Sequence, residues 1–242
     1  MKKLRIPKGF RELRGRLENE FADMLAPDLK ANGADRIHVV LASETDLNCC
    51  GQFSGLHSPR IHGWLRSYIS KWNGPAPTML IDDATITNDC GGRWDLMAER
   101  FTAIAVHELG HIVCTPRLFD HDHESDKAMS DMVRQAFVES LEKKATFYSH
   151  ASPRIGHGPE WLRIVCHLVH RMQKRRWNIY PPQIVDTNYY GYSSTSLYRN
   201  ALGDEPSRLA RLPMTAIAHL PPPQKFLDQW NADLAEWPDG KF

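Results

Sequence analysis

Residues 95–113 have the sequence DLMAERFTAIAVHELGHIV, an apolar helical pattern that ends in a His-Glu-x-x-His motif. Apolar side chains recur in it at the three- and four-residue intervals of a helix that buries one face. Asp95 is the expected N-cap of this helix. Because positions i and i+4 lie on one face of a helix, His107 and His111 can direct two imidazole nitrogens at the same point. The segment therefore predicts a central helix that carries a metal site.

Two histidines one turn apart, with a glutamate next to the first, are typical of a zinc site that activates water. A catalytic zinc ion binds nitrogen ligands at about 2.0–2.1 Å and keeps one coordination position open for water. Glu108 lies beside the face that carries His107 and His111, where its carboxylate can reach that water. We expect these two histidines to bind Zn²⁺ and Glu108 to be the catalytic base. The alternative is a pair of core histidines with ordinary hydrogen-bond partners.

The elements before the motif predict an α+β domain. Apolar spacing and turn residues indicate a helix, a strand, a second helix and a second strand, at about residues 10–25, 37–42, 61–69 and 78–87. Pro27 is expected to end the first helix. The second strand would border the active-site cleft, where an unpaired edge can hold an extended peptide; an ordinary covered strand fits the same pattern.

Two further segments follow the motif helix. The pattern predicts a helical insertion at about residues 120–150, followed by a last core helix with Pro159 at its first position. Prolines and turn-forming residues are frequent beyond Trp177, so we expect residues 179–242 to be an irregular C-terminal extension. The expected domains are therefore residues 1–178 and this extension.

A catalytic zinc ion usually has three protein ligands, so a third ligand must come from elsewhere in the chain. The metzincin pattern fails, because residues 115–118 contain neither the required glycine nor the histidine. Glu139 is the candidate for a thermolysin-like arrangement, and His121 and His123 are nearer in sequence. His157 is favoured over these, because the glycine and proline after it restrict the backbone just before a helix.

The pairing of HELGH at residues 107–111 with HGPEW at residues 157–161 resembles the SprT-like zinc metalloproteases. The resemblance covers roughly residues 10–177 and implies a zincin-like domain with a small sheet packed on helices. It also implies that His107, His111 and His157 bind zinc, that Glu108 is the catalytic acid and base, and that the substrate is a protein or peptide. Two departures are the long linker between the motifs and the lack of the cysteine-rich zinc ribbon found in many bacterial members.

Composition sets broad limits on location and partners. A net charge of +1 argues against a surface devoted entirely to a polyanion, although basic residues cluster in residues 1–16 and at Arg171 and residues 174–176. Contact with nucleic acid therefore stays open. No apolar leader or membrane-spanning stretch is apparent, and the five cysteines form no C-x-x-C motif. We expect a cytoplasmic protein with reduced thiols and no membrane partner, of undetermined oligomeric state.

Two other functions fit the same motif. One is a zinc-stabilised scaffold or binding module without catalysis, against which the intact Glu108 argues. The other is a zinc hydrolase that acts on a non-peptide amide. Tyr189, Tyr190 and Tyr192 are candidates for stabilising an oxyanion by residue type alone, and a packed aromatic cluster is an alternative for them.

Overall fold

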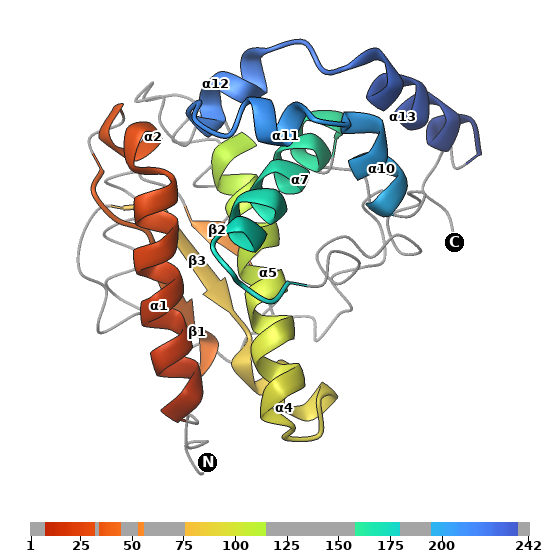
Figure 1. Cartoon of the computed structure of the whole chain (residues 1–242). Helices are drawn as coiled ribbons and strands as arrows, with labels where there is room; N and C mark the ends of the chain where they lie inside the picture. The colour runs from red at the N-terminus through yellow and green to blue at the C-terminus, as the bar shows by residue number, and fades with distance from the viewer. Residues whose placement is uncertain are drawn as a thin grey trace, which may run out of the picture. The chain divides into compact units, whose positions relative to one another are not determined.

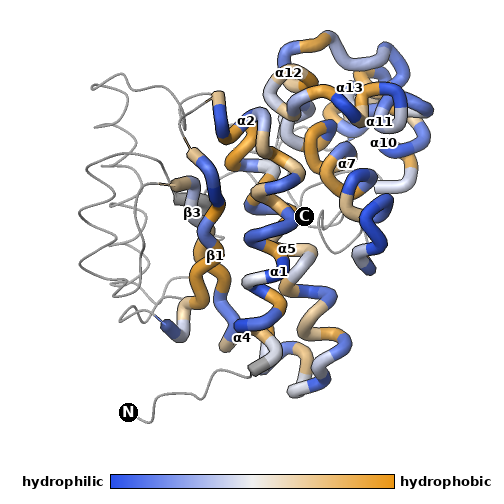
Figure 2. Tube along the Cα trace, turned by 60° about the vertical axis from the view of Figure 1, so that its left-hand side comes forward, coloured by the Kyte–Doolittle hydropathy of each residue, from blue (hydrophilic) through white to orange (hydrophobic). Residues whose placement is uncertain are grey.

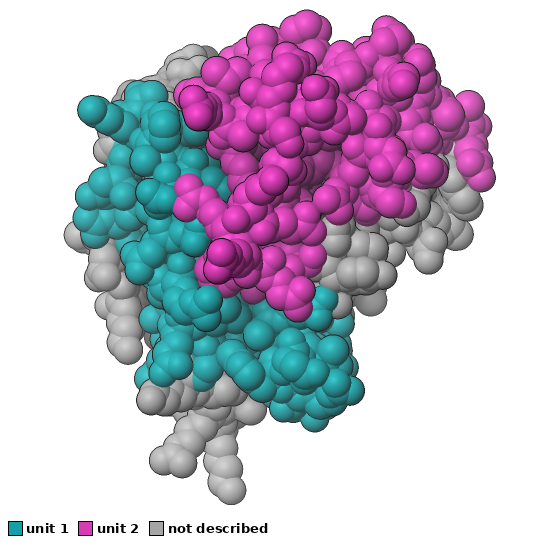
Figure 3. Space-filling view, viewed as in Figure 1, with its two compact units in different colours: residues 1–101, 115–149 teal, residues 102–114, 150–242 magenta. Residues whose placement is uncertain are grey.

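The computed structural model describes residues 8–31, 34–44, 53–55, 76–114, 158–179 and 195–236. The chain forms two compact units, one of residues 1–101 and 115–149, the other of residues 102–114 and 150–242 (Figure 3). The division falls inside the motif helix. The domain boundary expected at residue 178 stays a prediction. The described elements are mostly helical with one small sheet, which is an α+β composition.

Within the described residues, the sheet of the first unit has three strands in the order β1-β3-β2 (Figure 1). Strand β1 (His38–Leu41) runs parallel to β3 (Thr78–Ile81), and β2 (Phe53–Gly55) runs antiparallel to β3 on its other side. All four residues of β3 are buried, as expected of a central strand. The segment of β1 is largely coloured as hydrophobic in Figure 2. The strand predicted at residues 37–42 is confirmed.

The strand predicted at residues 78–87 is shorter than expected and has no unpaired edge. It ends at Ile81, and residues 83–89 form helix α4 (Asp83–Asp89). Asp82 is the N-cap of this helix: its carboxylate accepts hydrogen bonds from the Thr85 backbone N–H at 2.9 Å and the Thr85 hydroxyl at 2.7 Å. Because β3 pairs on both sides, it is not available to an added peptide strand, and of the two alternatives that the sequence left open the covered strand is the one found.

Helix α1 (Lys8–Met24) packs its apolar face in the first unit and contacts β1. Phe10, Leu17 and Phe21 on that face are fully buried. The carboxylate of Glu18 accepts a hydrogen bond from the backbone N–H of Val39, at 2.9 Å, and so joins the helix to strand β1. Helix α2 (Ala26–Ala31) follows after one residue. Pro27 thus lies in the first turn of α2, where a missing N–H costs little.

The motif helix is α5 (Trp94–Cys114), and its N-terminal part belongs to the first unit. The Phe10 ring contacts the rings of Trp94 and Phe101, with centroids 5.3 and 5.2 Å away. Asp95 lies within the first turn, so its prediction as N-cap was wrong by at least one position. Its exposed carboxylate instead accepts a hydrogen bond from Arg93 Nη2 at 2.8 Å.

The second unit is built on helix α7 (Pro159–Lys174), which begins with Gly158 as N-cap and Pro159 in its first turn, as predicted. Among the described residues, four helices follow: α10 (Thr195–Leu202), α11 (Glu205–Arg208), α12 (Met214–His219) and α13 (Gln224–Glu236). Helix α7 contacts α10, α11 and α12, and α13 contacts α10 (Figure 1). Hydrophilic and hydrophobic residues alternate along the tube of α7 in Figure 2, as expected of an amphipathic helix.

The expectation of an irregular C-terminal extension was wrong for residues 195–236, which are mainly helical. Its glycine and prolines separate short helices: Gly203 has φ 59° just before α11, and Pro213 precedes α12. A turn-rich composition therefore marked the breaks between helices and not their absence. The predicted helices at residues 61–69 and 120–150 lie outside the described residues.

A buried polar cluster joins α11 to α7. Glu205 Oε1 accepts hydrogen bonds from Arg163 Nε and His167 Nε2, each at 2.8 Å. Arg163 Nη1 also donates to the Leu220 carbonyl oxygen at 2.6 Å. Burial lowers the pKa of His167, which favours the neutral ring with its proton on Nε2. The side chains of all three cluster residues are at most 4 % exposed, so the cluster is part of the core of the unit.

Candidate metal centre

The two motif histidines converge on one point beside α5. His107 Nε2 and His111 Nε2 lie 3.2 Å apart, and their ring centroids are 5.0 Å apart with an interplanar angle of 67°. Both side chains are half-buried. The convergence follows from the helix, because side chains four residues apart lie one above the other on the same face.

This nitrogen pair fits a zinc ion. Two nitrogen ligands at about 2.0–2.1 Å from one tetrahedral zinc ion lie about 3.3–3.4 Å from each other. The observed separation of 3.2 Å is close to that value. It also equals a hydrogen-bond distance, so a single proton shared by the two rings is the metal-free alternative. The donor set suits zinc, since imidazole nitrogen is among its preferred ligands.

Glu108 lies between these two histidines in sequence and is only 5 % exposed. Burial raises the pKa of its carboxyl group to about 8, and no charged group among the described residues contributes to the shift. A carboxyl group in such surroundings is poised to hold a proton near neutral pH, and a neighbouring positive charge would act in the opposite direction. Buried acids with shifted pKa values are typical of general acid and base positions.

Trp161, in the first turn of α7, contacts both histidines. Its ring stacks on His111, with centroids 5.3 Å apart and an interplanar angle of 25°, and meets His107 edge-on at 4.8 Å. The sequence indicated Trp161 only as part of the HGPEW motif and as a core residue. No pattern within either segment predicts its contact with the motif histidines, because the two segments are far apart in the chain.

The third ligand stays a prediction. His157 precedes Gly158, the N-cap of α7, in the sequence but lies outside the described residues, as do His121, His123 and Glu139. The candidate oxyanion residues Tyr189, Tyr190 and Tyr192 also lie outside them. Within the part of the chain that the structure describes, no three His, Cys, Asp or Glu side chains gather as a metal site.

Helix α7 carries two further histidines. His167 donates a hydrogen bond to Glu205 and is a buried core residue. His170 Nε2 lies 3.4 Å from the Ser207 hydroxyl, and its pKa is lowered by partial burial and by nearby cations, including Lys174. Neither histidine belongs to a described metal-binding group.

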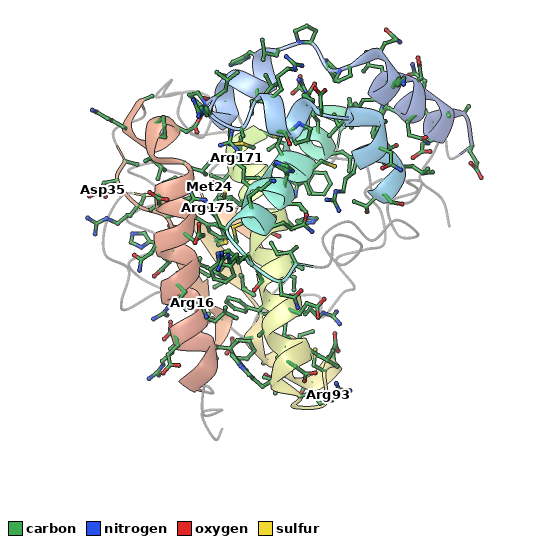
Figure 4. All side chains as sticks on the ribbon, in the orientation of Figure 1. Arg16, Met24, Asp35, Arg93, Arg171 and Arg175 are labelled. Atoms are coloured by element: carbon green, nitrogen blue, oxygen red, sulfur yellow. The ribbon has the colours of Figure 1, made fainter. Side chains whose placement is uncertain are left out.

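One residue of the basic stretch on the same helix, Arg171, has structural partners. Arg171 and Arg175 lie one turn apart at its C-terminal end (Figure 4). Arg171 Nη2 donates to the carbonyl oxygens of Leu212, at 2.5 Å, and Leu209, at 3.4 Å. Arg171 therefore serves the packing of the turn after α11, and a role for this stretch in nucleic-acid contact stays a prediction.

Three of the five cysteines are described, and all three are free thiols: Cys90, Cys114 and Cys166. Burial raises the pKa of Cys114 and of Cys166 to about 12. Thiols with such raised pKa values are poor nucleophiles at neutral pH, because the thiolate is the reactive form. The redox state expected for the cysteines stays a prediction.

Comparison of the chain with protein-family models, with curated proteins and with solved structures found no match. Among the described helices, none combines the length and the apolar character that crossing a membrane requires.

Because the comparisons give no relative, the function of the chain has to be inferred from the geometry of α5 and α7.

Proposed function

We propose that this chain is a zinc-dependent metallopeptidase of SprT-like type. The observation that carries the proposal is the convergence of His107 Nε2 and His111 Nε2 to 3.2 Å, next in sequence to the buried carboxyl group of Glu108. In a structural zinc site, protein ligands fill all four coordination positions, so no metal-bound water is present for a neighbouring acid to deprotonate. His157 is the proposed third ligand.

Each residue has a distinct role in the proposed reaction. His107, His111 and His157 hold the metal through their imidazole nitrogens. A bound zinc ion supplies a Lewis acid that lowers the pKa of water and polarises a carbonyl group. The carboxylate of Glu108 takes the proton of the attacking water and then gives it to the departing amine nitrogen, so the peptide bond is cleaved with one water consumed. Burial of Glu108 keeps bulk water away from this proton transfer.

The test compares the wild type with Glu108→Gln, which keeps the size of the side chain and removes its ability to take a proton. We expect the wild type to bind one zinc ion and to cleave a flexible protein such as casein, with or without DNA. We expect Glu108→Gln to bind zinc as the wild type does and to lose activity by about 10²–10⁴-fold or more, the usual contribution of a general base. Metal analysis and gel-based proteolysis measure both properties.

Glu99→Gln is the matched control, because it makes the same substitution about two and a half turns earlier on the same helix. It should keep both zinc and activity. Proteolysis by the Glu108→Gln variant at the wild-type rate would overturn the mechanism. Stoichiometric zinc without hydrolysis of any peptide or amide by the wild type would favour the zinc-binding scaffold.

A further inference from the structure

Trp161 is placed differently from the other buried apolar side chains of α7. It is 2 % exposed, and its indole ring contacts both motif histidines, stacked on His111 and edge-on to His107. One rigid aromatic ring thus borders two imidazoles that come from successive turns of another helix. Each imidazole can rotate about two side-chain bonds, so a fixed neighbour on both rings restricts where their nitrogens point.

Gly110 explains how the indole comes so close to α5. A Cβ atom added at Gly110 would lie 2.9 Å from Trp161 Nε1, 3.3 Å from Trp161 Cδ1 and 2.7 Å from Val165 Cγ2. The first and last distances are shorter than carbon atoms tolerate, so any larger residue would push α7 or its side chains away. Gly110 is not among the described glycines with positive φ, so the need for glycine here is one of space.

A glycine inside a helix is also unfavourable by itself. It lowers helix stability relative to alanine, because the flexible backbone loses more entropy on folding. Gly110 lies in the middle of the motif, between Glu108 and His111. Close packing of Trp161 and Val165 against position 110 explains why glycine is found there. The same packing lets α7 come close enough for Trp161 to contact the two histidines.

We propose that Trp161 and Gly110 are positioning residues for the metal ligands. The indole of Trp161 holds the rings of His107 and His111 so that both Nε2 atoms face one ion, and Gly110 leaves the space in which the indole sits. The proposal rests on the proposed zinc site and adds the part of the chain that prearranges it. Neither residue is assigned contact with the ion or the substrate.

The test measures zinc affinity in Trp161→Leu, Trp161→Phe and Gly110→Ala by competition with a chromophoric chelator. Partners that orient metal ligands typically contribute about 10–100-fold to metal affinity, so we expect Trp161→Leu to weaken zinc binding by about that factor. Trp161→Phe keeps an aromatic ring and should bind zinc with a Kd near that of the wild type. The visible spectrum of the cobalt-substituted protein should change in Trp161→Leu and resemble the wild type in Trp161→Phe.

Gly110→Ala distinguishes close approach from helix propensity. Alanine favours a helix more than glycine, so propensity alone would raise the melting temperature and leave the zinc Kd unchanged. If the close contact with Trp161 decides the outcome, Gly110→Ala should instead lower the melting temperature and weaken zinc binding. This variant also keeps the proposal testable if Trp161→Leu does not fold.

Phe226→Leu is the matched control. It alters another fully buried ring of the same unit, one that contacts Tyr198 at 5.4 Å between centroids. It should lower the melting temperature and keep the zinc Kd of the wild type. Unchanged zinc affinity in both Trp161→Leu and Gly110→Ala would show that Trp161 only fills space and would overturn the inference. Failure of the wild type to bind zinc would instead overturn the proposed function on which it rests.

Discussion

At the scale of single residues, carboxylates of the first unit bind backbone N–H groups that the regular elements leave open. Asp82 binds the Thr85 N–H at the start of α4, and Glu18 binds the Val39 N–H of strand β1. Asp83 accepts hydrogen bonds from the backbone N–H and hydroxyl of Ser43. Burial raises the pKa of Glu18 and of Asp83 despite these hydrogen bonds. A buried backbone group without a partner is costly, so these acids stabilise the turns around the sheet.

Asp82→Ala is expected to lower the free energy of unfolding by about 1 kcal/mol, within the 0.5–2 kcal/mol range of lost N-caps. The cause is the loss of the acceptor for two hydrogen bonds from Thr85. Urea unfolding followed by circular dichroism measures the effect. Asp95→Ala removes an aspartate whose side chain, like that of its ion-pair partner Arg93, is largely exposed, and it should change stability by less than about 0.5 kcal/mol. Equal losses in the two variants would contradict the assignment of Asp82 as the cap.

At the scale of elements, α7 is central to the second unit because its side chains contact both α5 and α11. Its first turn brings Trp161 to the histidines of α5, and the next turns bring Arg163 and His167 to Glu205 of α11. The short helix α11 has four residues and could not persist alone, since isolated helices of that length are unstable in water. The buried ion pair therefore fixes a segment whose own helical preference is weak.

Arg163→Met is expected to lower the free energy of unfolding by about 3–5 kcal/mol, because it leaves the buried carboxylate of Glu205 without its cation. Thermal and urea unfolding measure the loss. Arg208→Met makes the same change at an exposed position of α11 and should have an effect within about 0.5 kcal/mol. A small effect of Arg163→Met would mean that the ion pair contributes little beyond its desolvation cost.

At the scale of the whole molecule, buried ionisable groups make stability depend on pH in opposing directions. The pKa of His167 is lowered, so the folded chain binds this proton less tightly than the unfolded chain below pH 6.5. The pKa of Glu205 is lowered by Arg163 and His167 against the effect of burial, so its contribution is lost as the pH falls below about 4.5. The raised pKa values of Glu18 and Asp83 act in the opposite sense, since their folded forms bind protons more tightly.

Comparison of the wild type with His167→Gln isolates one of these groups. The stabilising contribution of neutral His167 should be complete above pH 6.5 and decline as the pH falls toward its lowered pKa, by at most about 1.4 kcal/mol per pH unit. In His167→Gln, which carries no titrating ring, that part of the pH dependence should vanish. The difference in unfolding free energy between the two proteins, followed from pH 7.5 to about 5, is the measurement. A difference that grows on acidification would mean that the folded chain holds the His167 proton more tightly.

Local patterns predicted the three longest described helices, strand β1 and the shared face of His107 and His111. Strand β1 and helices α1, α5 and α7 follow apolar spacing that each segment carries by itself. The end of β3 was missed although a cap signal was present, since Asp82 and Thr85 have the spacing of an N-cap with its partner. Helices α10, α11 and α12 were missed because they are short and separated by proline and glycine, so no long periodic run marks them. Helix α13, with 13 residues, was missed although Phe226 and Trp230 have helical spacing.

The sequence by itself determined that His107 and His111 share a face with Glu108 between them, because a four-residue spacing is a property of any helix. Only the tertiary structure decided that β3 is the central strand, that Glu205 pairs with Arg163, and that Trp161 lies against both histidines. Each of these facts joins segments far apart in the chain. Such contacts depend on how whole elements pack, which the pattern within one segment does not encode.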